Sequence, residues 1–238
     1  MTNIKLYTSR LILSSNSWFI LSSIFLFSFL LFSCTTSNYQ SDANSSTAIT
    51  LPYFNIPDWT PEWIEKTDSQ YQQIHQIPAF NFEDQEGSMI SNKTVNGKIY
   101  VANFFFTSCR GICPKMTSNM YLLQEAFKLD TSILFLSHSV TPESDSVSIL
   151  KKYAIENKVN SKQWHLLTGP KKDIYDLAKK QYFAGDTIGY YQTGNEFLHT
   201  ENFILVDQRQ RIRGVYNGTL LVEIERIKED IAILKKEL

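Results

Sequence analysis

The chain has 238 residues, of which 43% are hydrophobic and 13% aromatic, enough to bury the core of one ordinary domain with appendages. Its 23 basic and 24 acidic residues leave a net charge of −1, which gives no electrostatic basis for binding nucleic acid. With only nine glycines and seven prolines, the chain is neither collagen-like nor of low complexity.

The N-terminal segment is typical of an export signal. Lys5 and Arg10 supply a positive start, and residues 11–32 are mostly apolar. The segment ends in Leu-Phe-Ser-Cys, which resembles a bacterial lipobox, where Cys34 becomes the lipidated first residue. We therefore predict a lipoprotein signal peptide at 1–33. An uncleaved anchor is the alternative, since about 20 apolar residues can span a bilayer. Both leave the remaining chain outside the cytoplasm and tethered to a membrane.

Residues 34–76 are predicted to form a flexible tether and an N-terminal extension. The part at 35–50 is rich in Ser, Thr, Asn and Gln, which is typical of a flexible spacer. The part at 51–75 contains two tryptophans and three prolines, and its pattern assigns no helix or strand.

Residues 77–238 have the pattern of a folded domain in which strands alternate with helices. Phe80 and Phe82 alternate before a turn, which predicts an N-terminal hairpin. Buried strands are predicted at 99–106 and 133–140 and a short strand at 164–167. Helices are predicted at 114–128, 142–157, 171–183 and 219–236, and a hairpin at 203–206 and 211–216. This order implies an α/β fold with a central mixed sheet flanked by helices, and with a β-hairpin before the last helix.

Two cysteines, Cys109 and Cys113, lie between the first buried strand and the helix that Pro114 opens. A thiol pair in this place narrows the fold to a thioredoxin-like one. Unpaired N–H groups at a helix start lower the pKa of a thiol, and Arg110 adds a positive charge. Helix rise separates residues four apart by roughly 6 Å, which a disulfide accepts. We therefore predict a reactive redox pair with a Cys109–Cys113 disulfide.

Other uses of the two thiols remain open. A structural disulfide would close a very short loop and gain little entropy. Two thiolates suit Cu(I), whereas Cu(II) or zinc needs further ligands, usually a histidine. His75 lies in the extension, His138 is expected in the core, and His165 is expected to be structural or exposed. His199 ends the irregular stretch 184–198, and long loops often carry function. Position alone still favours an ordinary loop residue over a ligand there.

Four ordered segments resemble the SCO/SenC family of copper chaperones. Residues 106–114 read FTSCRGICP and are similar to the family's Cys-x3-Cys-Pro motif. The other three are SVTPESD at 139–145, WHLLTG at 164–169, and His199-Thr200 ahead of the strand FILVD. Cys-x3-Cys alone would be a weak signal, but the four together are specific. The resemblance covers about residues 77–238.

The resemblance implies a thioredoxin-like fold in which Cys109, Cys113 and His199 bind copper, as Cu(I), Cu(II) or both. It also implies delivery of copper to the binuclear copper centre of cytochrome c oxidase subunit II, or to another copper-accepting envelope protein. The protein would then be primarily a metallochaperone. It would be a lipoprotein of the cell envelope, with its domain on the periplasmic side of the membrane.

This chain departs from the family pattern at three positions. Arg110-Gly111 stand where the family often has Pro-Asp, and a positive charge there favours thiolate but opposes a bound cation. Leu198 stands where an acid commonly precedes the histidine and can orient its ring. Thr141 replaces an aspartate in a turn.

An envelope thiol–disulfide oxidoreductase is the alternative function. Thiolate attack through a mixed disulfide needs only Cys109 and Cys113, so His199 would be dispensable. The two functions can coexist, because an acceptor's cysteines must be reduced before they take copper. No feature of the sequence separately supports a peroxidase.

Overall fold

Five strands form the central sheet, in the order β7-β6-β5-β8-β9. The computed structural model describes residues 50–185 and 200–237. The strands are β5 (Ile99–Phe105), β6 (Ile133–Ser139), β7 (Trp164–Leu167), β8 (Asn202–Val206) and β9 (Ile212–Asn217). The pairs β5–β6 and β6–β7 are parallel, whereas β8 pairs antiparallel with both β5 and β9. The mixed sheet agrees with the predicted one.

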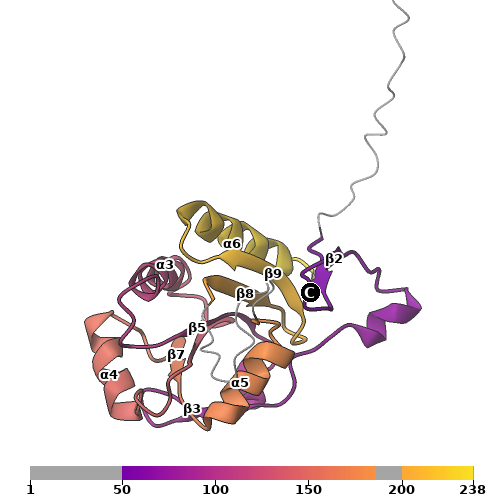
Figure 1. Cartoon of the computed structure of the whole chain (residues 1–238). Coiled ribbons are helices and arrows are strands. Elements are labelled where there is room, and N and C mark those ends of the chain that lie inside the picture. Colours follow the sequence, from indigo (N-terminus) through magenta and orange to yellow (C-terminus); the bar gives the residue numbers. More distant parts are fainter. Residues whose placement is uncertain (1–49, 186–199, 238) are drawn as a thin grey trace, which may run out of the picture. The chain divides into compact units, whose positions relative to one another are not determined.

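Both faces of this sheet are covered, because successive side chains of a strand point to opposite faces. In β5, Val101 and Phe105 belong to one core cluster, whereas Tyr100 and Phe104 belong to the other. The first cluster includes side chains of α3 (Cys113–Ala126), α4 (Val147–Glu156) and α6 (Leu221–Leu234). The second includes those of α5 (Lys171–Lys180) and of the hairpin β3 (Asn81–Glu83) and β4 (Met89–Ser91). Figure 1 shows α3 and α6 above the sheet and α5 and β3 below it.

The helix predicted at 142–157 begins later than expected, at Val147. Pro142 does not open it. Instead the backbone N–H groups of Ser144 and Asp145 both donate to the carbonyl of Thr141, at 2.9 Å each. This tight turn precedes the helix, whose N-cap is Ser146. The prediction was wrong at this end, because the turn closed on the Thr141 carbonyl lies between Pro142 and the helix.

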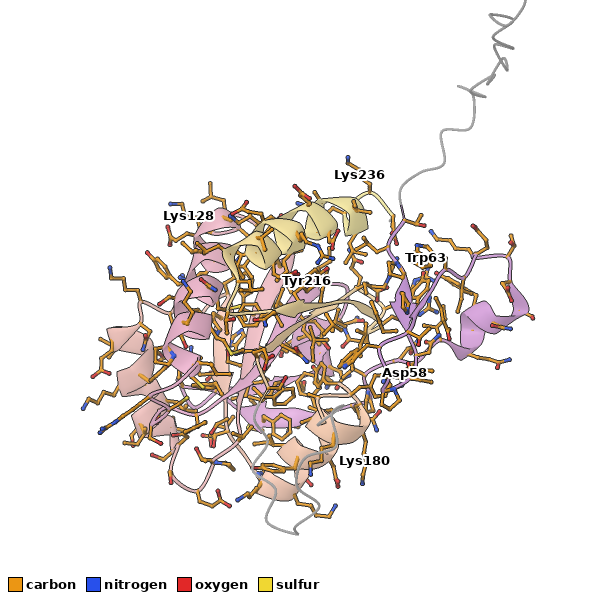
Figure 2. The ribbon with its side chains drawn as sticks, turned by 45° about the horizontal axis from the view of Figure 1, so that its top comes forward. Asp58, Trp63, Lys128, Lys180, Tyr216 and Lys236 are labelled. Carbon is orange, nitrogen blue, oxygen red and sulfur yellow. The ribbon has the colours of Figure 1, made fainter. Side chains whose placement is uncertain are left out.

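The N-terminal extension packs onto the domain through aromatic and cationic side chains. It contains β1 (Tyr53–Phe54), β2 (Pro61–Glu62) and the 3-10 helix η2 (Ser69–Gln73); α2 (Asn92–Val95) follows the β3–β4 hairpin. The Arg213 guanidinium lies over the Tyr53 ring at 4.2 Å, and that of Arg211 over the Tyr71 ring at 4.3 Å. Figure 2 labels Asp58 and the exposed Trp63 on this extension.

The predicted signal peptide at 1–33, the lipidation site Cys34 and most of the spacer lie outside the described residues. The predicted domain boundaries at 33 and 76 remain predictions. Within 50–185 and 200–237, no helix is both long and apolar enough to cross a membrane.

Candidate thiol site

The two cysteines lie where the sequence predicts them, at the carboxyl end of β5. Cys109 is in the loop between β5 and α3, and Cys113 is the first residue of α3. Cys113 is buried, with 3% of its surface exposed, whereas Cys109 is half-buried. Both are free thiols. The N-cap Ile112 offers no side-chain hydrogen bond, and the backbone amides of residues 111–113 donate to Cys109.

The environment of the pair separates the acidities of the two thiols. Burial acts to raise the pKa of Cys109, but hydrogen bonds from the Cys113 thiol and from backbone amides of residues 111–113 outweigh it and lower that pKa. Burial, and then donation of its own hydrogen bond to Cys109, raises the pKa of Cys113 to about 12. Cys109 is therefore the more acidic thiol and the nucleophile of the pair, and Cys113 is the hydrogen-bond donor beside it.

Tyr153 of α4 borders the pair, although sequence reasoning did not identify it. Its hydroxyl is hydrogen-bonded to the Thr117 hydroxyl of α3 at 2.8 Å, and its ring packs on Phe105 with centroids 5.5 Å apart. Burial raises the pKa of Tyr153, and the nearby charges of Cys113 and Cys109 raise it further. The phenol thus lies in the same core cluster as the two cysteines and is close enough to feel their charge.

Asp145 was also missed, although it lies in the SVTPESD segment. It is 1% exposed and accepts hydrogen bonds from the backbone and the hydroxyl of Thr107, two residues before Cys109. Ser139 and Thr141 donate to it as well, at 2.6 and 3.0 Å. The signal that could have found it is the run of hydroxyl residues at the ends of two apolar strands.

The three described histidines have other surroundings. His75 is hydrogen-bonded to the Gln181 carbonyl at 2.8 Å, and His165 to the Asp84 carboxylate at 2.9 Å. His138 is fully buried in the core, as predicted, and His165 is buried and structural. His199 lies outside the described residues. In the described part of the chain, no three His, Cys, Asp or Glu side chains are grouped to hold a metal ion.

The fold and the site define a thioredoxin-like domain with a reactive dithiol at the start of a helix. The family model SCO1/SenC matches residues 68–235, so the chain belongs to the SCO1/SenC family. The SCO1 protein homolog of Bacillus subtilis strain 168 is 30% identical over 159 residues, which cover 66% of this chain and 81% of that protein.

Solved structures of the family share this fold. A SCO1/SenC family lipoprotein from Bacillus anthracis is 31% identical, with a TM-score of 0.60, over 68% of this chain and 95% of that one. BsSco, described with a disulfide switch and as a cytochrome c oxidase assembly protein, is 29% identical with a TM-score of 0.56, over 68% and 94%. More distant Sco proteins, 18–23% identical, share the fold and have been solved with copper bound.

Proposed function

We propose that this chain is a copper chaperone of the cell envelope that loads the binuclear copper centre of cytochrome c oxidase subunit II. The observation that carries the proposal is the pair Cys109 and Cys113, one acidified and one buried, in a member of the SCO1/SenC family. Family relatives described as oxidase assembly proteins, and others with copper bound, support both parts of it.

Cys109 and Cys113 supply two sulfur ligands in this proposal, and His199 supplies an imidazole. Two thiolates suffice for Cu(I), whereas Cu(II) gains from the added nitrogen. Topology supports the choice of His199. Because β8 is antiparallel to β5, with Ala102 opposite Ile204, β8 begins at the end of the sheet where β5 ends. Thr200, the neighbour of His199 in sequence, therefore precedes β8 at the cysteine end.

Copper titration of the reduced full chain in detergent tests the binding step. We expect one copper per chain, with thiolate-to-Cu(II) charge-transfer absorption that His199→Ala removes or shifts. His75→Ala is the matched control, because that imidazole lies in the extension and bonds the Gln181 carbonyl at the end of α5, so its loss should leave the spectrum unchanged. Failure of the wild type to bind copper at a stoichiometric ratio would refute the proposal.

Transfer to the acceptor is tested separately. Copper-loaded chain is mixed with copper-free subunit II whose cysteines are reduced, and the optical spectrum of the binuclear centre is followed. We expect that spectrum to appear with the wild type and not with Cys109→Ser. If copper binds but the spectrum never appears, the acceptor is another envelope protein.

A thiol–disulfide oxidoreductase is the second candidate, favoured by the difference in pKa between the two thiols. The Cys109 thiolate attacks a disulfide sulfur of the target, which releases one target thiolate and leaves a mixed disulfide. Cys113 then loses its proton and displaces the second target thiol, leaving the target reduced and Cys109–Cys113 oxidised. Turnover with a protein disulfide that is unchanged in His199→Ala would favour this function.

Membrane attachment through lipidated Cys34 belongs to the same proposal, and the Bacillus anthracis lipoprotein supports it. Cells fed labelled palmitate should label the wild type, and Cys34→Ala should lose the label. Label retained in Cys34→Ala would exclude a lipid at that position.

A further inference from the structure

Asp145 is a buried carboxylate whose two oxygens receive four hydrogen bonds from neutral donors. Oδ1 accepts from the Thr107 hydroxyl at 2.6 Å. Oδ2 accepts from the Thr107 backbone N–H at 3.2 Å, from Ser139 at 2.6 Å and from Thr141 at 3.0 Å. A carboxylate is expensive to bury, so a residue held in this way needs nearly every one of these donors.

The donors come from segments that have to meet at the thiol site. Thr107 belongs to the cysteine loop, Ser139 is the last residue of β6, and Thr141 begins the turn before α4. The Cys109 N–H donates to the Phe106 carbonyl at 3.3 Å, so residues 106–109 form a turn with Thr107 inside it. Asp145 is therefore hydrogen-bonded to this turn at Thr107, two residues before Cys109.

We propose that Asp145 is a positioning residue, which holds the turn of residues 106–109 so that Cys109 stays beside the start of α3. For copper this role rests on the proposed function, but its effect on the thiol pair does not. Without the hydrogen bonds from Thr107 to Asp145, residues 106–109 can adopt more conformations. The sulfur atoms of Cys109 and Cys113 then spend less time close together. The effective concentration of one thiol at the other then falls.

The hydrogen bonds, more than the charge, carry this role. An asparagine placed with its oxygen at the Oδ2 position still accepts from the Thr107 N–H, Ser139 and Thr141. Its amide then meets the Thr107 hydroxyl, which can reverse and accept. Asp145→Asn thus keeps the hydrogen bonds to the turn, whereas Asp145→Ala loses all four of them. This difference separates a positioning role from an electrostatic one.

The test is the equilibrium of the full chain with the glutathione couple, without copper. One glutathione disulfide oxidises the dithiol to the Cys109–Cys113 disulfide and yields two glutathione thiols. We expect Asp145→Ala to lower the equilibrium constant about tenfold, and Asp145→Asn to stay within threefold of wild type. A decrease of less than threefold in Asp145→Ala overturns the proposal, as does an equal loss in both variants.

Two further variants keep the test decisive if Asp145→Ala does not fold. Thr107→Val removes one donor and should lower the constant at least threefold, and Thr107→Ser should restore it. Asp130→Ala is the control at the other end of β6, where Asp130 holds a turn through the Ser132 N–H and hydroxyl and also pairs with Lys235. A similar loss in Asp130→Ala would show a general structural effect and overturn the proposal.

This readout also separates two possible failures. A wild type that oxidises normally and binds no copper contradicts the proposed function alone. A wild type that binds copper, with Asp145→Ala indistinguishable from it towards glutathione, contradicts the positioning role alone.

Discussion

The two ends of the central sheet each bury an aspartate, and they satisfy it with different chemistry. At the cysteine end, Asp145 receives hydroxyls and a backbone amide. At the other end, Asp207 in the turn between β8 and β9 is 5% exposed and pairs with the Arg213 guanidinium at 3.2 Å. The backbone N–H groups of Arg209 and Arg211 also donate to Asp207.

The end of the sheet that contains Asp207 and Arg213, called the ionic end below, joins segments that are far apart in sequence. Arg213 donates to the carbonyls of Leu51 and Pro52, at 2.7 and 3.0 Å, and pairs with Glu237 at 2.8 Å. It thus ties the start of the described chain to the residues that follow α6. Cations are therefore concentrated where the chain must be held together. At the cysteine end the donors to Asp145 are neutral, and Arg110, in the cysteine loop, is exposed.

The largest effect expected from this comparison is on stability, in Arg213→Ala. The substitution leaves Asp207 and Glu237 without their buried partner, which typically costs about 3–5 kcal/mol. Urea unfolding followed by circular dichroism measures the loss. The rate at which Cys109 is alkylated should not change in the folded variant, because Arg213 belongs to the opposite end.

Arg226→Ala is the matched control for this prediction. Arg226 pairs with Glu223 on the exposed face of α6, and such pairs contribute at most about 1 kcal/mol. A loss below 1 kcal/mol in Arg213→Ala, or equal losses in the two variants, would mean that the ionic end does not hold the chain together.

At the cysteine end, the two thiols should differ in their rates of alkylation. Cys109 has a lowered pKa, whereas burial and its hydrogen bond raise that of Cys113 to about 12. At neutral pH, iodoacetamide should modify Cys109 at least tenfold faster than Cys113, after allowance for the weaker nucleophilicity of the more acidic thiol. The Cys109 rate rises with pH and levels off above its pKa, whereas the Cys113 rate still rises toward pH 12.

Peptide mass spectrometry at a series of pH values distinguishes the two sites. In Cys113→Ala the donated hydrogen bond is lost, so the plateau for Cys109 should move to higher pH. Tyr121→Phe, on the same helix but not bonded to either sulfur, should leave the profile unchanged. Equal labelling of both cysteines in the wild type would contradict the assignment of Cys109 as the nucleophile.

The sequence predicted the sheet well, because β5 and β6 are near-continuous apolar runs, as parallel strands buried on both faces must be. It also placed both cysteines correctly, since their position follows from the local order of strand and helix. Asp145 and Tyr153 could not be assigned in this way. Their roles depend on contacts with Thr107 and Thr117, which lie 38 and 36 residues away.

Dependence on distant contacts also explains why the packing of the N-terminal extension could not be predicted from the sequence. Arg211 and Arg213 alternate along the chain, and that spacing places them on one face, but it does not tell which rings they meet. Their partners, Tyr53 and Tyr71, lie far upstream in a segment without periodicity. His199 shows the opposite case. The family resemblance, not its own sequence pattern, is what points to His199 as a ligand, and the metal set with Cys109 and Cys113 remains a prediction.

His138 extends the comparison to a buried polar group that has no hydrogen-bond partner among the described residues. It lies in β6 next to Ser139, is 0% exposed, and neither ring nitrogen is hydrogen-bonded within the described residues. Aromatic rings surround it, including Phe104 at 5.3 Å and Tyr182 at 5.7 Å between centroids. Burial lowers the pKa of His138 from 6.5 to about 3.

Acid should therefore destabilise the fold through His138. The unfolded chain binds a proton there below pH 6.5, but the native chain does not until about pH 3. Its contribution to stability is present above pH 6.5 and is lost by about 1.4 kcal/mol per unit as the pH falls toward 3. His138→Leu should remove this dependence and, at pH 7, stabilise the protein by about 1 kcal/mol, because it deletes an unsatisfied polar group.

His165→Leu is the matched control, since His165 is also buried but is bonded to Asp84. Its loss leaves that carboxylate short of a partner, so the change should destabilise by about 1–3 kcal/mol. Urea unfolding between pH 4 and 8 measures both variants. If His138→Leu lost stability at pH 7 as His165→Leu does, His138 would have to be satisfied by a partner outside residues 50–185 and 200–237. His138 would then no longer be an unsatisfied buried group, and the comparison would concern only the two carboxylates, Asp145 and Asp207.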